Sequence, residues 1–224
     1  MERIKAIQTP YKGYLFRSRL EARWAVFFDA LGIRYQYEPE GLELPDGTLY
    51  LPDFYLPDCK TFFEVKGLMT DKDMHKIEQL IKSGRCVAIG FDAADREAGL
   101  TFMACDHWGQ DENGIDLYSL ASELDSVLCR CHACGKYFFT GRTGIWDCTG
   151  CGNHDVEHDL DFLMDGDGAI YNDLVSEWRW LSDGSPDIRI DYKKGAPEEP
   201  VRRAVKRFKQ ARFEHGETPE RCSA

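Results

Sequence analysis

Two short cysteine motifs constrain the fold of this 224-residue chain more than any other feature of its sequence. Cys131-His132-Ala133-Cys134-Gly135 and Cys148-Thr149-Gly150-Cys151-Gly152 share the spacing Cys-x-x-Cys-Gly, and thirteen residues separate Cys134 from Cys148. Each motif can present two thiolates from one tight turn, and two such turns complete the tetrahedral set of ligands that zinc prefers in a structural site. The sequence therefore predicts a Zn²⁺ site formed by Cys131, Cys134, Cys148 and Cys151.

These motifs indicate a small module over residues 127–153. Between them, Tyr137-Phe138-Phe139, a glycine-containing turn and Ile145-Trp146 predict a β-hairpin, so the module would be a zinc ribbon. Its folding should depend on the metal, because a unit of this size buries little apolar surface. Free thiols or a disulfide pair are the alternative, and Cys129 is either a spare thiol or a substitute for Cys131. A ribbon can bind nucleic acid, bind a partner protein or a second copy of the chain, or serve a structural role, and the sequence does not choose among these.

The placement of the cysteines also bears on the cellular compartment. Five of the nine fall between Cys129 and Cys151, which is typical of a metal site rather than of the disulfide framework of a secreted domain. The segment from Met1 to Lys5 lacks the apolar stretch of a signal peptide, and no apolar run approaches the roughly 18 residues of a membrane span. We therefore predict a cytoplasmic protein with no membrane partner.

Charge is distributed unevenly along the chain. The net charge of −11 at pH 7 by itself argues against a nucleic-acid partner, since phosphate binding relies on Lys and Arg. However, residues 1–23 contain six basic residues against two acidic ones, and residues 189–212 contain nine against three. An acidic connecting region is expected between them, over residues 154–197. Basic ends of this kind are compatible with DNA or RNA as a partner.

Apolar spacing and turn residues predict an α/β domain over residues 1–122. Helices are expected at Arg17–Leu31, which Gly32 would end, and at Asp71–Ser83, because apolar residues recur there every three or four positions. Strands are expected where β-branched and aromatic residues gather, at Ile33–Tyr37, Leu49–Leu56, Thr61–Lys66 and Cys86–Phe91. This order predicts a mixed β-sheet flanked by helices.

A basic amphipathic helix is expected over residues 198–216. Its apolar positions share one face and basic residues surround them; the apolar set is Val201, Ala204, Val205, Phe208 and Ala211. Such a helix could lie along a phosphate backbone, or it could dock on the protein with its basic side in solvent.

A turn at residues 57–60 brings two acidic residues together. With four residues in the turn, Leu56 faces Thr61, and Asp53 is therefore opposite Glu64. Alternate residues of a strand point the same way, so Glu64 and Lys66 share one face. Two carboxylates about 5 Å apart repel by roughly 3 kcal/mol at an effective dielectric of 20. Unless both are solvated strand positions, a divalent cation is expected there, and hard oxygen ligands suit Mg²⁺ or Mn²⁺.

The same residues carry a resemblance to a known family. Pro52-Asp53, ten intervening residues and then Glu64-Val65-Lys66 resemble the signature of the PD-(D/E)XK nuclease superfamily. The segments at residues 16–24, 37–40 and 50–54 are similar to its Vsr-like and transposon-end-cleaving branch and to phage-encoded relatives.

The resemblance implies a restriction-endonuclease-like fold and a Mg²⁺-dependent endonuclease that hydrolyses DNA. Asp53 and Glu64 would hold the metal, Lys66 would orient the attacking water, and Glu21 would complete the catalytic site. Glu21 has a second interpretation, because Ser18 three residues earlier forms a capping box in which Glu21 would bond the Ser18 amide. The alternative from another class is a non-catalytic nucleic-acid-binding or regulatory protein on a nuclease-like scaffold.

Overall fold

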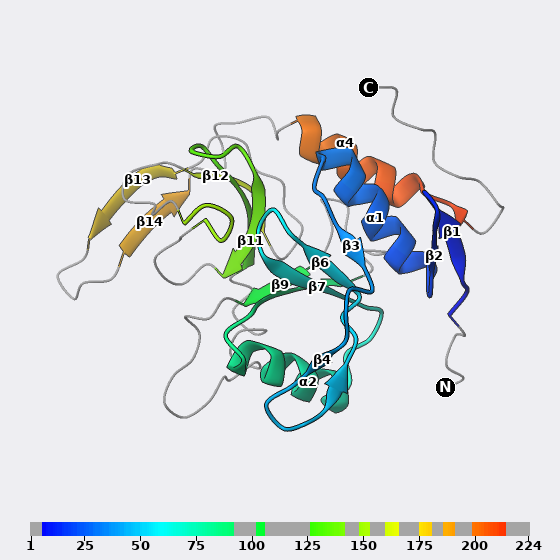
Figure 1. Cartoon of the computed structure of the whole chain (residues 1–224). Coiled ribbons are helices and arrows are strands. Elements are labelled where there is room, and N and C mark those ends of the chain that lie inside the picture. The colour runs from blue at the N-terminus through cyan, green and yellow to red at the C-terminus, as the bar shows by residue number, and fades with distance from the viewer. Residues whose placement is uncertain are drawn as a thin grey trace.

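A mixed five-stranded sheet lies at the centre of the fold (Figure 1). The computed structural model describes residues 6–91, 102–105, 126–141, 148–152, 160–165, 175–180, 186–190 and 199–213. The sheet has the order β3-β6-β7-β8-β9, and β7 and β8 pair in parallel while the other neighbours are antiparallel. Its strands are β3 (Gln36–Tyr37), β6 (Phe54–Leu56), β7 (Thr61–Lys66), β8 (Cys86–Phe91) and β9 (Phe102–Cys105). The predicted mixed sheet with flanking helices is confirmed at this level.

The remaining strands form smaller sheets. One has three strands in the order β11-β10-β12, and three others are antiparallel pairs, β1-β2, β4-β5 and β13-β14. The bounds are β1 Thr9–Tyr11, β2 Tyr14–Phe16, β4 Leu42–Glu43, β5 Leu49–Tyr50, β10 Ser126–Cys131, β11 Tyr137–Gly141, β12 Leu160–Asp165, β13 Val175–Trp180 and β14 Pro186–Ile190. Three of these strands, β12 to β14, lie in the acidic connecting region expected over residues 154–197.

One predicted strand is divided in two. The sequence predicts a single strand over Leu49–Leu56, whereas β5 pairs with β4 and β6 pairs with β3 and β7. Pro52 has no amide hydrogen to donate to a sheet, and the chain bends at Asp53. Asp53 therefore stands just outside β6, where its side chain can turn towards β7.

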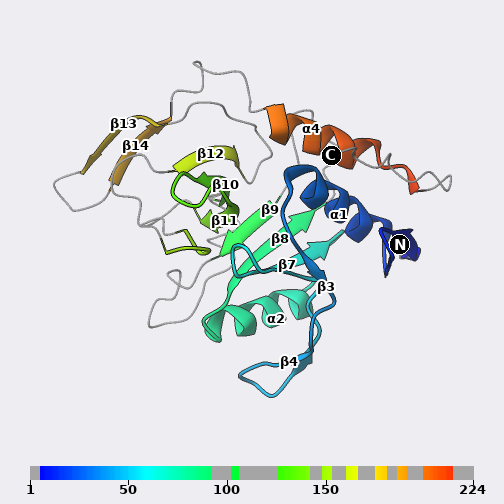
Figure 2. The same ribbon diagram turned by 45° about the horizontal axis from the view of Figure 1, so that its top comes forward.

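Two helices cover opposite faces of the central sheet (Figures 1 and 2). Helix α1 (Arg19–Leu31) begins after the N-cap Ser18 and ends at Gly32, whose φ of 69° is left-handed. Its Trp24 ring lies 4.7 Å from that of Phe63. A Cβ atom at Gly90 would lie within 2.6 Å of both rings, so glycine is needed there for α1 to approach the sheet.

Helix α2 (Asp71–Lys82) packs on the other face. Thr70 and Asp73 form a capping box at its start. It contributes Ile77, Leu80 and Ile81 to a second hydrophobic cluster, together with residues of β8.

The predicted C-terminal helix is docked on the protein. Helix α4 (Glu199–Gln210) lies beside α1, with the Phe208 and Trp24 rings 5.2 Å apart (Figure 1). The side chain of Arg23 donates to the carbonyl oxygen of Ala211 across 3.1 Å. All five predicted apolar positions are buried, while the basic residues Arg202, Arg203, Lys206, Lys209 and Arg212 are exposed. The helix was expected over residues 198–216, whereas α4 ends at Gln210 and residues 211–213 are not α-helical. Residues 198 and 214–216 lie outside the described part of the chain.

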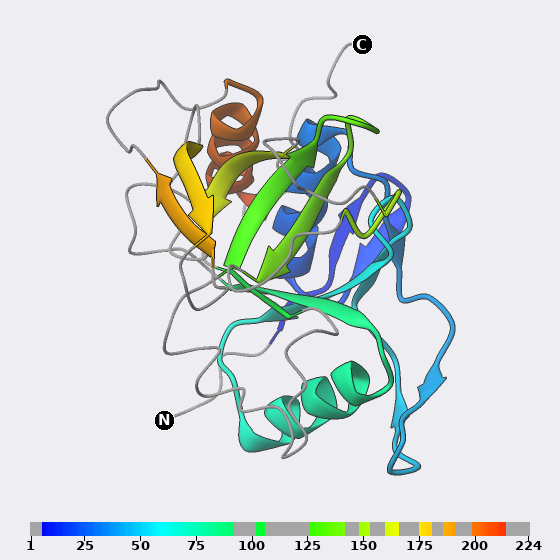
Figure 3. The same ribbon diagram turned by 90° about the vertical axis from the view of Figure 1, so that its left-hand side faces the viewer.

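The cysteine module stands against the sheet (Figure 3). Its strands β10 and β11 form a hairpin around the first cysteine motif, and Phe138, Phe139 and Cys148 belong to the same hydrophobic cluster as α1, β7 and α4. The predicted partner strand at Ile145-Trp146 lies outside the described residues. The domain boundaries drawn from the sequence stay predictions. Within the described part of the chain, no helix combines the length and the apolar character that a membrane span requires.

Candidate active site

The β6–β7 hairpin has the predicted register. Leu56 pairs with Thr61 and Phe54 with Phe63, so the next position outward sets Asp53 opposite Glu64. The amide of Asp53 donates to Oε1 of Glu64 at 3.2 Å, and the amide of Val65 donates to Oδ2 of Asp53 at 2.9 Å. Each carboxylate is thus held by a backbone amide from the other arm of the hairpin.

One ammonium group joins the two carboxylates. Nζ of Lys66 lies 3.0 Å from Oε2 of Glu64 and 3.6 Å from Oδ2 of Asp53. Glu64 is 1% exposed and Asp53 is 7% exposed, so the pair lies in a largely water-excluded site. Asp73, at the start of α2, reaches within 4.0 Å of the same nitrogen. The structure therefore brings together Asp53, Glu64 and Lys66 as the sequence predicts.

Glu21 lies next to this group and is held differently from the expectation. Its carboxylate accepts hydrogen bonds from the Ser18 hydroxyl at 2.7 Å, the Arg17 amide at 3.0 Å and the Tyr37 hydroxyl at 2.8 Å. The sequence predicts a hydrogen bond from the Ser18 amide to the Glu21 carboxylate. In the structure, the Arg17 amide donates to that carboxylate instead. The Ser18 hydroxyl still accepts from the Glu21 amide, so the serine caps the helix as expected. Glu21 is 7% exposed and ties the start of α1 to β3.

Arg17 is a site residue that sequence reasoning missed. Its guanidinium binds Oδ1 of Asp53 at 2.9 Å and Oε1 of Glu38 at 2.6 Å, and its side chain is half exposed. The periodicity placed Arg17 inside the first helix, whereas the helix begins at Arg19. A basic residue directly before an N-cap serine is a weak signal, and only the fold brings it to Asp53, 36 residues away.

Burial and neighbouring charges shift the pKa values of the site. Burial and the Asp53 carboxylate raise the pKa of Glu64, although Lys66 opposes this. Burial also raises the pKa of Glu21, against the hydrogen bonds from Ser18 and Tyr37. Burial would lower the pKa of Lys66, but the Glu64 and Asp53 carboxylates outweigh it and raise the pKa. The ammonium therefore stays charged, while both glutamates bind a proton more readily than in water.

The site carries more negative than positive charge. Two cationic side chains, Arg17 and Lys66, lie among five carboxylates, those of Glu21, Glu38, Asp53, Glu64 and Asp73. Oxygen donors with excess negative charge suit Mg²⁺ or Mn²⁺. The carboxylates are spread around the two cations and are not gathered into a group of three with ligand atoms all within 4.8 Å.

Among the described residues, only the four predicted cysteines are gathered that closely. The Sγ atoms of Cys131 and Cys151 are 3.8 Å apart, and those of Cys134 and Cys148 are 3.7 Å apart. Four sulfurs placed tetrahedrally at about 2.3 Å from one ion would lie about 3.8 Å apart. A disulfide would need about 2 Å. The four cysteines could therefore hold a metal ion such as zinc.

Backbone turns position these sulfurs. The amide of Gly135 donates to the carbonyl oxygen of Cys131 and that of Gly152 to Cys148, both at 2.7 Å. Each glycine has a left-handed φ, 70° and 72°, which explains the glycine after each Cys-x-x-Cys. Cys129 is buried and lies outside the group of four, so it is not a substitute for Cys131.

Comparison with known proteins identifies no relative of the chain. No protein-family model matches it, no curated protein matches it significantly, and no solved structure does so.

Proposed function

We propose that the chain is a Mg²⁺-dependent endonuclease that hydrolyses phosphodiester bonds in DNA through a PD-(D/E)XK-like centre. The observation that carries the proposal is the buried carboxylate pair, Asp53 and Glu64, which shares the Lys66 ammonium at one end of the β6–β7 hairpin. A fold that buries two carboxylates beside each other needs cations to offset their repulsion. Lys66 and the half-exposed Arg17 supply two positive charges, and the neighbouring carboxylates of Glu21, Glu38 and Asp73 leave the site with excess negative charge.

Each residue has a defined part in the proposed mechanism. Asp53 and Glu64 would hold Mg²⁺ or Mn²⁺, which when bound polarises a phosphoryl oxygen and lowers the pKa of water. Lys66 donates a hydrogen bond to the attacking water and offsets negative charge that develops on the phosphate. Glu64 orients that ammonium at 3.0 Å. Glu21 completes the acidic wall, and Arg17 offers its guanidinium to a non-bridging phosphate oxygen once it leaves Asp53.

Cleavage assays with isosteric variants test this proposal. The protein is incubated with supercoiled, linear, single-stranded and branched DNA, and with RNA, in the presence and absence of Mg²⁺ or Mn²⁺. Asp53→Asn, Glu64→Gln and Lys66→Ala should each abolish metal-dependent cleavage, while Glu21→Gln tests whether Glu21 belongs to the catalytic site or serves only to hold the start of α1. Arg85→Ala, on the same domain but outside the site, serves as the control. Cleavage by the Asp53→Asn and Glu64→Gln proteins at the parental rate would refute the proposal, and cleavage of RNA alone would change the substrate.

The four cysteines are proposed to form a structural Zn²⁺ site in a zinc ribbon. The sulfur separations of 3.7 and 3.8 Å support this, as do the two glycine turns. Burial raises the pKa of Cys148, so bound metal is what would keep that sulfur a thiolate at neutral pH.

A non-catalytic nucleic-acid-binding or regulatory protein is the second candidate. One observation favours it, namely that both oxygens of Asp53 already have partners in the chain, Arg17 and the Val65 amide. Calorimetric titration with Mn²⁺ discriminates between the two. A scaffold of this kind would not bind the ion, whereas the proposed enzyme binds it and loses it on Asp53→Asn substitution.

A further inference from the structure

Both cysteine motifs touch one residue, Asp58, in the turn between β6 and β7. Lys136, which follows the first motif, donates to Oδ1 of Asp58 at 2.5 Å. Gly150, inside the second motif, approaches the backbone so closely that a Cβ atom there would lie 2.4 Å from the Asp58 carbonyl oxygen. The two contacts are independent, because one involves the side chain of Asp58 and the other its backbone.

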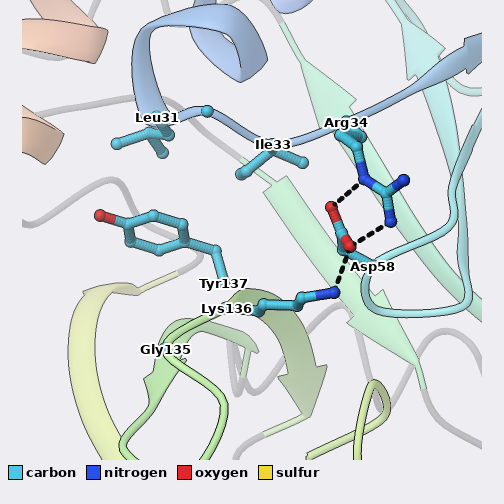
Figure 4. Close-up of a pocket in the computed structure, with 8 residues that line it drawn as sticks. Leu31, Ile33, Arg34, Asp58, Gly135, Lys136 and Tyr137 are labelled. Atoms are coloured by element: carbon cyan, nitrogen blue, oxygen red, sulfur yellow. Dashed lines mark hydrogen bonds and ion pairs between the residues drawn. The ribbon is translucent and has the colours of Figure 1, made fainter.

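The other side of Asp58 is anchored to the end of α1. Arg34 makes a two-pronged contact with its carboxylate, at 2.8 Å and 2.6 Å. Figure 4 shows Arg34 and Lys136 converging on Asp58, beside a pocket of about 340 Å³ whose lining includes Ile33 and Tyr137. The carboxylate is only 11% exposed, and the hydrogen bonds from Arg34 hold its pKa well below the usual range. The Asp58 carboxylate therefore resists protonation as the pH falls.

The turn that Asp58 occupies connects the two arms of the candidate active site. Asp53 lies before β6 and Glu64 and Lys66 lie on β7, so the turn joins the two segments whose register sets Asp53 opposite Glu64. A second contact joins the hairpin to the cysteine module, because the ring of Phe63 on β7 lies 5.3 Å from that of Phe139 on β11. Phe63 directly precedes Glu64.

We propose that Asp58 is a positioning residue through which metal loading of the four-cysteine site holds the β6–β7 hairpin, and with it Asp53 and Glu64, in register. With the metal bound, the two motifs keep Lys136 and Gly150 at fixed places against Asp58. Without it, the cysteine turns lose the ion that joins them, and the hairpin loses both contacts together. The inference goes beyond the proposed nuclease activity, since it concerns the order of the hairpin in the absence of nucleic acid.

Hydrogen exchange of the full-length protein, without nucleic acid or Mg²⁺, tests this. The reporter is the Val65 amide, which donates to Asp53. The amides of α2 are the internal reference, because α2 packs in the second hydrophobic cluster, apart from the one that contains the module. In the parent, removal of zinc with a chelator should speed Val65 exchange about tenfold or more and leave α2 nearly unchanged. Reloading with zinc should restore it.

Variants separate the Asp58 contact from loss of the module. Lys136→Ala should keep one zinc per chain. Even so, the Val65 amide of its zinc-loaded form should exchange nearly as fast as that of the zinc-free parent. Lys136→Arg should restore the slow exchange rate. Lys82→Ala is the matched control, since Lys82 donates to Glu78 at the same 2.5 Å on the exposed side of α2. Gly150→Ala should act as Lys136→Ala does, by steric displacement. A parent whose Val65 exchange ignores zinc, or a Lys136→Ala protein with the parental zinc dependence, would overturn the proposal. Neither result bears on the proposed nuclease activity, which the cleavage assay tests separately.

Discussion

Replacement of Arg17 by alanine should make the protein bind Mn²⁺ more tightly. The guanidinium of Arg17 lies 2.9 Å from Oδ1 of Asp53, a proposed metal ligand. A divalent ion bound to that oxygen at an ordinary distance of about 2.1 Å would lie within about 5 Å of the guanidinium nitrogen. Under the proposed function, Arg17 would therefore compete with the metal for the same carboxylate.

The size of the effect follows from charge and exposure. Charges of +2 and +1 about 5 Å apart repel by about 1.7 kcal/mol in bulk water and by about 7 kcal/mol at an effective dielectric of 20. Arg17 is half exposed and can swing away, so the metal has to overcome only the ion pairs with Asp53 and Glu38, each worth up to about 1 kcal/mol. We expect Arg17→Ala to lower the dissociation constant for Mn²⁺ about tenfold, which corresponds to about 1.4 kcal/mol.

The assay is isothermal titration of Mn²⁺ into zinc-loaded protein without nucleic acid. Lys12→Ala is the matched control, because Lys12 is also half exposed and pairs with an aspartate, Asp29, at 2.8 Å, outside the candidate active site. Its affinity for Mn²⁺ should equal that of the parent. If Arg17→Ala binds Mn²⁺ as the parent does, or more weakly, then Arg17 does not compete with the ion for Asp53. The proposal that Arg17 leaves Asp53 when the metal binds would then be wrong.

Three further predictions concern stability and the cysteine site. Without divalent metal, Glu64→Gln should raise the melting temperature at pH 8, and the gain should vanish as the pH falls towards the ordinary glutamate value of 4.5. The sign follows because burial raises the pKa of Glu64 in the folded state above its value in the unfolded chain, so the parent loses stability as the pH rises through that raised pKa. Phe208→Ala should lower the free energy of unfolding in urea by about 3–5 kcal/mol, whereas the exposed Lys206→Ala should change it by less than about 0.5 kcal/mol; equal effects would contradict the docking of α4. By elemental analysis, the parent should contain about one zinc ion per chain, Cys134→Ser should lose it and Cys59→Ser should retain it. Full zinc occupancy in Cys134→Ser would refute the four-cysteine assignment.

Local signals made several elements predictable from the sequence. Apolar spacing and a terminal glycine placed the end of α1, and Thr61–Lys66 and Cys86–Phe91 are strands with the predicted bounds. The four-residue turn was enough to set Leu56 against Thr61. In each case, the residues that determine the structure are close together in the chain.

Other features depend on contacts between distant segments. Strands β12 to β14 lie in an acidic stretch with no clear alternation, and β12 is defined by its pairing with β10. The ion pair of Arg17 with Asp53 spans 36 residues, and that of Lys136 with Asp58 spans 78. Neither partner is marked by a local pattern. The sequence therefore predicted the carboxylates and the lysine of the site. It did not predict that Arg17 pairs with Asp53, or that Asp58 joins the hairpin to the cysteine module through Lys136.

The docking of α4 on α1 has a consequence for synthesis on the ribosome. The contact between Arg23 and Ala211 joins positions 188 residues apart. At about 5–20 residues per second, the ribosome needs roughly 10–40 s to make the intervening chain. Throughout that interval, the face of α1 that α4 will cover is exposed on the nascent polypeptide. Helix α1 is synthesised early, but its packing partner α4 is synthesised late. A prematurely terminated chain would therefore retain the carboxylates of the candidate active site and yet present an uncovered apolar surface to chaperones and proteases.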